Sequence, residues 1–183
     1  MLKFIGNCKN IIDWDNVIET INSRPCDYVG PRHDVDSQVN GVDDVVFPIK
    51  DAGYVFKQNG GNAGWNMYFP GDQFPFEVQD KFAEFVGIEN ILSCWISKVF
   101  PGDVAPWHWD ITDDEPTLNS THDIKRFHCH IDIPRDGHIF IVEDTCLYNQ
   151  EQGNVWQWPS RKSWHAGANA GLTPKYLFNM WGI

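Results

Sequence analysis

Residues 107–110 read Trp-His-Trp-Asp, and a second histidine, His165, and a lysine, Lys175, follow much later in the chain. Side chains alternate between the two faces of a strand, so His108 and Asp110 would share one face of this stretch. His165 would add an imidazole from a distant strand. Two histidines and one carboxylate are the ligand set that holds ferrous iron and leaves other coordination positions open. The spacing therefore predicts an iron site with His108, Asp110 and His165 as its ligands.

The elements around residues 107–110 favour a metal site over a chance pair. A His-x-Asp pair by itself is more often part of a polar strand face. Here the pair His108 and Asp110 follows a strand-like run at 91–100 and a Pro-Gly turn at 101–102. After the pair come a basic strand, a Gly-Asn turn at 153–154 and the second histidine. Strands at short intervals without helices between them are typical of an antiparallel barrel or sandwich.

Residues 125–133 alternate between polar and apolar types, as a half-buried strand does. The polar face would carry Arg126, His128, His130 and Asp132, and the other face is apolar. An arginine and two histidines on one strand face are unusual if that face only meets water. A solvated polar face remains the alternative, more so for His130 than for the other two.

The rest of the chain predicts one domain spanning residues 1–183, with helices and outer strands in 1–90 and a metal-binding β core in 91–183. Helical spacing indicates helices at 10–23 and 74–85, the second ended by Gly87. Short β-rich runs separated by turns indicate strands at 45–49, 54–56, 138–142, 155–158 and 176–181. Loops are expected at 24–44, 59–64 and 112–123, and these would decide the substrate.

Composition excludes several classes of protein. Lys and Arg total 14 against 25 Asp and Glu, a formal net charge of −11, so duplex nucleic acid is not an expected partner. Five cysteines without a Cys-x-x-Cys pair indicate reduced thiols rather than a disulfide framework or a zinc ribbon. No apolar run has membrane-spanning length, so we expect a cytoplasmic protein without a membrane partner. The oligomeric state stays open.

The candidate iron site resembles that of the iron- and 2-oxoglutarate-dependent dioxygenases. Within that superfamily, the run at 126–134 (Arg-Phe-His-Cys-His-Ile-Asp-Ile-Pro), the Gly153 turn, and His165 followed by a cation at Lys175 are similar to the aspartyl/asparaginyl β-hydroxylase family. The likeness covers roughly residues 91–183. It implies a mainly β fold, a double-stranded β-helix of the jelly-roll or cupin type, with covering helices from the N-terminal half.

The resemblance also implies Fe(II) and 2-oxoglutarate as cofactors. Arg126 and His128 would lie near the metal-bound end of the cosubstrate, and Lys175 would receive its distal carboxylate. The family usually has arginine at the position of Lys175. A lysine ammonium is a point charge, whereas the arginine guanidinium can form two parallel hydrogen bonds with a carboxylate. The affinity for the cosubstrate, and the identity of the cosubstrate, can therefore differ from those of the family.

Nine tryptophans and twelve phenylalanines are a large aromatic content for 183 residues. Most are expected to be ordinary core. Near the candidate site, aromatic rings would help to exclude water from the reaction. We therefore assign three tryptophans to the substrate side of the site, Trp107, Trp109 and Trp156. His130 is assigned there as well, because it shares a strand face with His128.

The activity that the resemblance implies is hydroxylation of an amino-acid side chain of the Asp, Asn or Pro type, in a peptide or protein, with succinate and CO₂ as coproducts. A small-molecule substrate stays open. One alternative is a cupin-type metalloenzyme that needs no 2-oxoglutarate, in which His122, His128, His130 or His138 supplies a further ligand. Another is a jelly-roll binding protein without catalysis. Oxygen uptake with and without 2-oxoglutarate separates these classes.

Overall fold

The computed structural model describes residues 1–29, 66–71, 74–108, 124–160 and 163–183. The expected strands at 45–49 and 54–56, the expected loops at 59–64 and 112–123, and Trp109 and Asp110 lie outside these ranges. The statements below concern the described residues.

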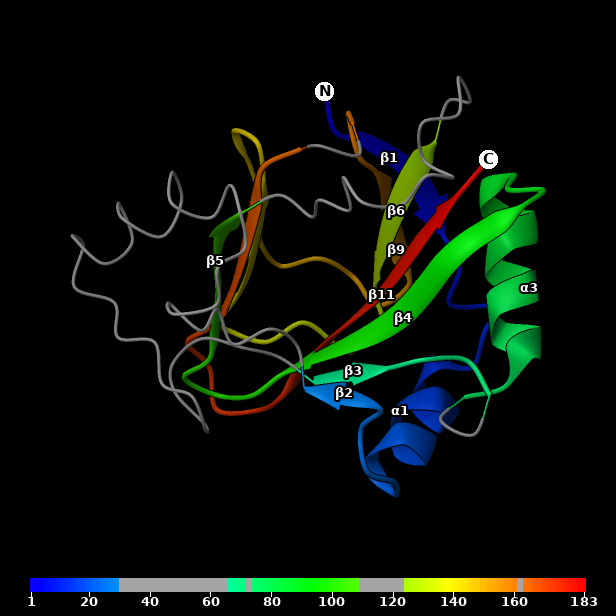
Figure 1. Cartoon of the computed structure of the whole chain (residues 1–183). Helices are drawn as coiled ribbons and strands as arrows, with labels where there is room; N and C mark the ends of the chain where they lie inside the picture. The colour runs from blue at the N-terminus through cyan, green and yellow to red at the C-terminus, as the bar shows by residue number, and fades with distance from the viewer. Residues whose placement is uncertain (30–65, 72–73, 109–123, 161–162) are drawn as a thin grey trace, which may run out of the picture.

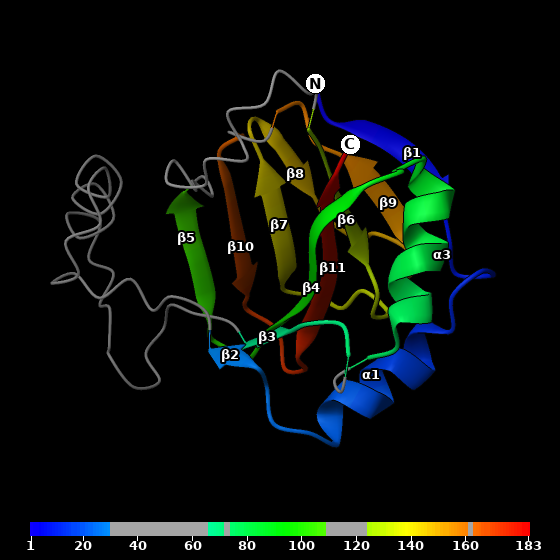
Figure 2. The same ribbon diagram turned by 45° about the vertical axis from the view of Figure 1, so that its right-hand side comes forward.

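Within these ranges the strands form two antiparallel sheets, which face each other in Figures 1 and 2. The seven-stranded sheet has the order β1 (Lys3–Asn7), β9 (Asn154–Gln157), β6 (Lys125–His130), β11 (Lys175–Gly182), β4 (Ile91–Val99), β3 (Asn66–Tyr68) and β2 (Tyr28–Val29). The four-stranded sheet has the order β5 (Val104–His108), β10 (His165–Asn169), β7 (His138–Val142) and β8 (Thr145–Leu147).

The strands from β4 to β11 make the double-stranded β-helix that the sequence predicts. The chain crosses from one sheet to the other between β4 and β5, β5 and β6, and β6 and β7, and again around β9, β10 and β11. Each sheet therefore interleaves strands that are distant in sequence, as in a jelly roll. This winding brings the start of β10 beside the end of β5.

Two helices cover the outer face of the seven-stranded sheet (Figure 2). Helix α1 (Trp14–Asn22) begins later than the predicted residue 10 because the Asp13 side chain accepts a hydrogen bond from the Asn16 amide (3.1 Å) and caps it. Helix α3 (Phe76–Val86) follows Pro75 and ends at Gly87, whose φ of 70° is the left-handed conformation that glycine favours.

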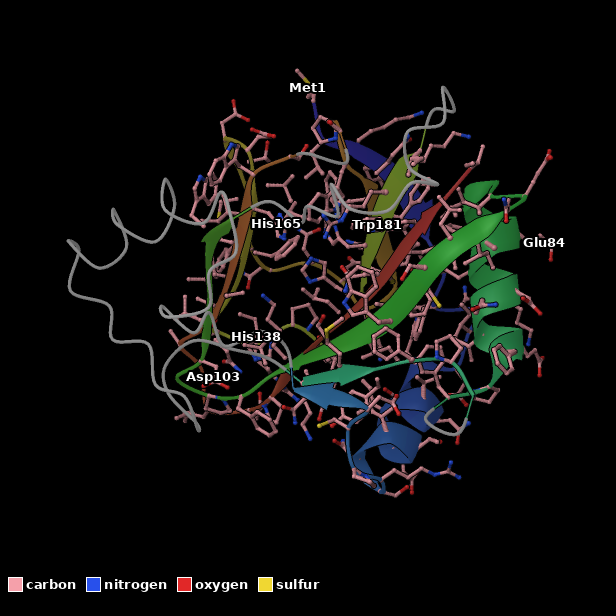
Figure 3. All side chains as sticks on the ribbon, viewed as in Figure 1. Met1, Glu84, Asp103, His138, His165 and Trp181 are labelled. Carbon is pink, nitrogen blue, oxygen red and sulfur yellow. The ribbon has the colours of Figure 1, made fainter. Side chains whose placement is uncertain are left out.

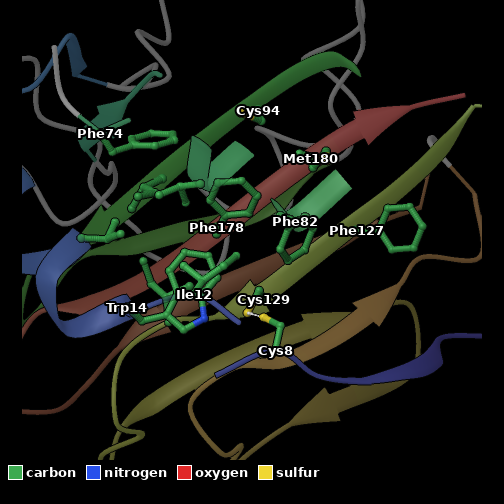
Figure 4. Close-up of a cluster of buried hydrophobic side chains, with 14 of the residues drawn as sticks. Cys8, Ile12, Trp14, Phe74, Phe82, Cys94, Phe127, Cys129, Phe178 and Met180 are labelled. Carbon is green, nitrogen blue, oxygen red and sulfur yellow. Dashed lines mark hydrogen bonds between the residues drawn. The ribbon is translucent and has the colours of Figure 1, made fainter. Parts of the chain in front are cut away.

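The apolar core lies between this sheet and the two helices (Figure 4). Phe178 of β11 packs against Phe82 of α3 with ring centroids 4.6 Å apart, and against Trp14 of α1 at 5.5 Å. Cys8 and Cys129 are buried in this core with their sulfurs 3.7 Å apart, and all five cysteines are free. One face of the seven-stranded sheet is therefore covered by the helices. Its other face is directed toward the four-stranded sheet.

Alternation predicts most of the strands well. The predicted strand at 138–142 coincides with β7. Strand β4 ends one residue before the predicted strand at 91–100, and β11 is one residue longer at each end than the predicted strand at 176–181. Four short strands, β1, β2, β3 and β8, are not predicted, and β2 lies within the segment 24–44 where a loop is expected. None of the described helices is both long and apolar enough to cross a membrane.

Candidate active site

The space between the two sheets is lined by polar side chains that are almost fully buried. On β6 they are Arg126, His128 and His130, as the alternation predicts, with exposed fractions of 2%, 0% and 5%. The strands β7, β10 and β11 add further buried polar residues, which are His138, His165, Asn169, Lys175 and Asn179. Figure 3 shows the labelled His165 and Trp181 on opposite sides of this interior.

This buried region carries positive charge in an otherwise acidic protein. Lys175 and Arg126 are both buried, and Asp132 is the one buried carboxylate among the residues described. Burying a charge costs several kcal/mol unless a partner compensates it. The burial of Lys175 therefore favours an anionic ligand close to its ammonium group.

The register of β5 and β10 places two of the predicted iron ligands opposite each other. His165 pairs with His108 in this antiparallel ladder. The register shifts between His165 and Gly167, so β5 has one additional residue there, next to Pro106. Proline lacks an amide hydrogen and is tolerated at such a bulge. Facing positions on neighbouring strands are what a shared metal ion requires.

The described residues do not contain a complete metal-binding group. No cluster of three potential ligands is found among them. Asp110 lies outside the described ranges, and for His108 the structure gives the backbone register only. The triad of His108, Asp110 and His165 therefore remains a prediction.

One hydrogen bond fixes the ring of His165. Its Nδ1 lies 3.1 Å from the carbonyl oxygen of Ser163, and a carbonyl oxygen only accepts hydrogen bonds. Nδ1 is therefore the protonated nitrogen, and Nε2 carries the lone pair. A hydrogen bond from the second ring nitrogen to a backbone carbonyl is the usual way to fix a metal-binding imidazole.

His128 has the opposite tautomer. The Trp158 indole Nε1–H donates to its Nδ1 over 2.7 Å, so Nδ1 carries the lone pair and Nε2 carries the hydrogen. Burial, reinforced by the charges of neighbouring groups, lowers the pKa of His128 well below its usual value, which keeps the ring neutral. Nε2 is buried without a hydrogen-bond acceptor in the described structure. His128 thus presents a donor suited to an oxygen ligand and not a lone pair suited to a metal.

Replacing Trp158 by Phe should release this tautomer. We expect His128 to populate both neutral tautomers in Trp158→Phe, and the free energy of unfolding to fall by roughly 1–3 kcal/mol as a buried acceptor loses its donor. Nitrogen-15 NMR of the imidazole rings measures the tautomer directly. Trp156→Phe is the matched control, because Trp156 donates to Gln150 instead (3.0 Å). A fixed Nε2–H tautomer in both variants would contradict the role of Trp158.

Arg126 is held by aromatic stacking. Its guanidinium carbon lies 3.5 Å from the centroid of Trp158 and 5.0 Å from that of Trp181. Stacking on two indoles fixes the plane of the guanidinium and compensates part of its desolvation. The arginine therefore keeps its charge at one end of the buried interior.

Lys175 is 1% exposed at the start of β11, and its Nζ donates to the carbonyl oxygen of Ile139 over 2.5 Å. Burial lowers the pKa of this ammonium to about 7, although the charge of Asp132 partly offsets the effect. A Cβ atom added at Gly167 would stand 3.5 Å from Nζ, so the glycine leaves space beside the ammonium.

Phe140 connects the candidate site residues. Its ring centroid lies 4.7 Å from that of His128 and 6.2 Å from that of His165, and the Lys175 Nζ lies 5.2 Å from it. The histidine at the start of β10 and the lysine at the start of β11 therefore border one compact interior. An apolar ring at its centre limits the access of water.

The residues predicted on the substrate side lie in different surroundings. His130 is buried, its ring is 5.4 Å from that of His128, and burial together with the charge of Lys175 lowers its pKa to about 3. Trp156 is half-buried and packs on Phe4 at 5.1 Å. Trp107 is 36% exposed and stacks on Trp164 at 6.4 Å.

Sequence reasoning does not assign roles to several buried polar residues of the site. Alternation groups Asp132 with the buried polar residues of β6 without giving it a role, although Asp132 lies two residues after the end of that strand. The sequence prediction does not include Asn169 and Asn179. The pattern of β11 holds a signal for Asn179, because it lies two residues from Leu177 and four from Lys175, on the same face. Asn169 offers none, because its partners are backbone atoms, of the distant Val99 and of the nearby Gly171 and Thr173.

Comparison with solved structures finds likenesses at low sequence identity. The chain is similar to a viral collagen prolyl hydroxylase from Paramecium bursaria Chlorella virus 1 in its 2-oxoglutarate complex, with 16% identity, a TM-score of 0.49, and coverage of 76% of this chain and 89% of that one. It is also similar to a predicted oxalate decarboxylase from Thermotoga maritima, with 12% identity, a TM-score of 0.41, and coverage of 66% and 81%.

A third similar structure is an oxidoreductase of the 2OG-Fe(II) oxygenase family from Burkholderia pseudomallei, with 13% identity, a TM-score of 0.40, and coverage of 58% of this chain and 50% of that one. No protein-family model matches the sequence, and no curated protein does either. At these identities and TM-scores the likenesses assign neither an activity nor a ligand to this chain.

Proposed function

We propose that this protein is a non-haem oxygenase that uses Fe(II) and 2-oxoglutarate. The observation that carries the proposal is the buried ammonium of Lys175 in a cationic interior that His165 also borders. A dicarboxylate between the sheets would compensate this charge. His108 faces His165 in the register of β5 and β10, as two iron ligands would.

In this proposal His108, Asp110 and His165 hold the iron, which supplies the oxygen chemistry when bound. Lys175 binds the distal carboxylate of 2-oxoglutarate as a point charge. The Nε2–H of His128 donates to an oxygen atom of the cosubstrate, and the Arg126 guanidinium adds positive charge. Both side chains are oriented before binding by Trp158, which reduces the entropy that binding costs.

The substrate class that we propose is an amino-acid side chain of the Asp, Asn or Pro type in a peptide or protein. His130 is the residue that we assign to its approach, since its Nε2 is buried without a hydrogen-bond partner among the described residues. Within the 2-oxoglutarate-dependent oxygenases, we propose that this protein is related to the aspartyl/asparaginyl β-hydroxylase family. It is supported by the positions of Arg126, His128, His165 and Lys175 around one interior.

A cupin-type metalloenzyme without 2-oxoglutarate is the second candidate. It is favoured by His130, a further buried imidazole close to His128. His128 is not suited to be an additional metal ligand, because the lone pair on its Nδ1 already accepts the hydrogen bond from the Trp158 N–H.

Oxygen uptake separates the two candidates. With Fe(II) and a reductant present, we expect oxygen consumption and succinate formation only when 2-oxoglutarate is added. Consumption at the same rate without 2-oxoglutarate, and without succinate, would support the cupin-type enzyme and refute the proposal.

The affinity for 2-oxoglutarate should depend on pH through Lys175. The pKa of this group is about 7 before binding, and a carboxylate partner raises it because it stabilises the charged form. Binding therefore takes up a proton above pH 7. We expect the affinity to be nearly constant below pH 6 and to fall roughly tenfold between pH 7.5 and 8.5.

Calorimetry of Mn(II)-loaded protein in buffers of different ionisation enthalpy measures this proton uptake. The expected value at pH 8 approaches one proton per ligand bound. An affinity that does not change from pH 6 to 9 would remove Lys175 from the site.

A further inference from the structure

We propose that Asp132, His138 and Asn169 form a buried clamp that positions Lys175 for the distal carboxylate of the cosubstrate. This inference rests on the proposed function. The three residues follow β6, begin β7 and end β10, and none is more than 8% exposed. Figure 3 labels His138, at the end of the interior where β11 begins.

The clamp holds peptide groups on both sides of Lys175. Before the lysine, the carbonyl oxygen of Thr173 accepts a hydrogen bond from Asn169 Nδ2 (2.8 Å) and lies 3.0 Å from His138 Nε2. After it, the amide of Tyr176 donates to Asp132 Oδ1 over 3.2 Å. Side chains from three segments therefore fix the backbone that carries the lysine.

The members of the clamp also fix one another. Asp132 Oδ2 lies 3.1 Å from His138 Nδ1, in a contact that is not an aligned hydrogen bond. Asn169 Nδ2 also donates to the carbonyl of Val99 (2.9 Å), while its Oδ1 accepts from the Gly171 amide (3.0 Å). With every polar atom of its amide occupied, Asn169 has one orientation that satisfies all of its partners.

The same strand holds the tip of the lysine. Ile139, which accepts the hydrogen bond from Nζ, directly follows His138 in β7, and His138 pairs with Asn169 across β7 and β10. One rigid pair of strands thus determines both the backbone and the ammonium position. A lysine side chain is flexible, so holding it at both ends before binding raises the affinity for the carboxylate that it meets.

The register explains the place of Asp132. Leu177 of β11 pairs with His130 of β6, and the Ile131 amide donates to the Tyr176 carbonyl, so the next position along brings Asp132 opposite Lys175. An asparagine at this position would keep the geometry. Its oxygen still accepts from the Tyr176 amide, and its NH₂ group takes the place of Oδ2 beside His138.

The test compares Asp132→Ala with Asp132→Asn in Mn(II)-loaded protein, with 2-oxoglutarate binding measured by calorimetry at pH 6, below the Lys175 pKa of about 7, because both variants remove the charge of Asp132 that supports the ammonium. We expect Asp132→Ala to bind at least tenfold more weakly than the wild type, and Asp132→Asn to remain within threefold. The monocarboxylate 2-oxobutyrate lacks the distal carboxylate, so its affinity should be the same in all three proteins. His138→Ala, a second variant, should show the same selective loss.

Tyr176→Phe is the matched control, because it removes the phenol that donates to Asn22 (2.9 Å) and keeps the Tyr176 amide contact. It should bind 2-oxoglutarate as the wild type does. Hydrogen exchange of the residue 176 amide, measured without metal, should accelerate in Asp132→Ala and not in Asp132→Asn.

Three results would overturn the clamp: unchanged 2-oxoglutarate binding in Asp132→Ala, an equal loss for 2-oxobutyrate, or an Asp132→Asn variant as weak as Asp132→Ala. If the wild type itself does not bind 2-oxoglutarate, the proposed function fails, and the clamp loses its role with it. The wild-type titration therefore distinguishes the two failures.

Discussion

Lys175→Met should abolish 2-oxoglutarate binding and, at the same time, make the ligand-free protein more stable at pH 7. Burial lowers the pKa of Lys175 from its usual 10.5 to about 7, so the folded state holds this charge at a cost. Each unit of such a shift corresponds to about 1.4 kcal/mol. An apolar side chain of similar volume does not carry this cost, so we expect the free energy of unfolding to rise, by at most about 5 kcal/mol for a pKa shift from 10.5 to about 7.

The pH dependence of stability gives a second readout of the same residue. The folded pKa of Lys175 lies below the unfolded one, so between pH 7 and 10.5 the unfolded chain binds the additional proton. The free energy of unfolding of the wild type should therefore rise with pH across this window. That contribution should be missing in Lys175→Met.

Chemical denaturation at several pH values measures both effects, and calorimetry measures the loss of binding. Lys98→Met is the matched control, since Lys98 lies on β4 opposite Tyr176 and its Nζ contacts Asn22 (2.6 Å). This variant should keep the wild-type affinity for 2-oxoglutarate. A Lys175→Met protein that binds 2-oxoglutarate normally would refute the role of the ammonium. Lys175→Arg should retain binding, because a guanidinium also pairs with a carboxylate.

His165→Ala should lose the metal and all turnover. In the proposed site His165 is one of three protein ligands, and its Nδ1 contact with the Ser163 carbonyl directs Nε2 as the metal-binding atom. Removal of one ligand from a triad leaves too few to retain Fe(II) during dialysis. We expect less than a tenth of the wild-type metal content and no detectable succinate.

Metal analysis after dialysis checks this result, and circular dichroism checks that the fold is kept. Trp164→Phe is the control, because Trp164 is adjacent in sequence but stacks on the exposed Trp107. It should retain the metal. Stoichiometric iron in His165→Ala would exclude this histidine as a ligand.

Much of the fold and part of the site follow from the sequence, because strand alternation is a local property. The strand at 138–142 is correctly predicted, and so is the polar face of β6, since each side chain's neighbours within one strand decide its face. The strand predicted at 125–133 ends at His130, and Ile133, predicted on the apolar face, is exposed. The same alternation correctly separates the buried polar face of β6 from Cys129 and Phe127 in the core.

Contacts between distant segments could not be predicted in this way. The hydrogen bond from Trp158 to His128 joins β6 to the residue that follows β9, and the contacts of Asn169 join the end of β10 to backbone atoms of β4. Such contacts depend on the register between strands, which no local pattern determines. The same holds for the contact between Asp132 and His138.

The central claim is that His108, Asp110 and His165 hold one ferrous ion to which 2-oxoglutarate binds beside Lys175. Anaerobic equilibrium dialysis against Fe(II), followed by titration of the loaded protein with 2-oxoglutarate, tests it most directly. We predict one iron per chain and 2-oxoglutarate binding that disappears when the metal is chelated. A wild-type chain that retains no iron, or that binds 2-oxoglutarate equally well without it, would contradict the claim.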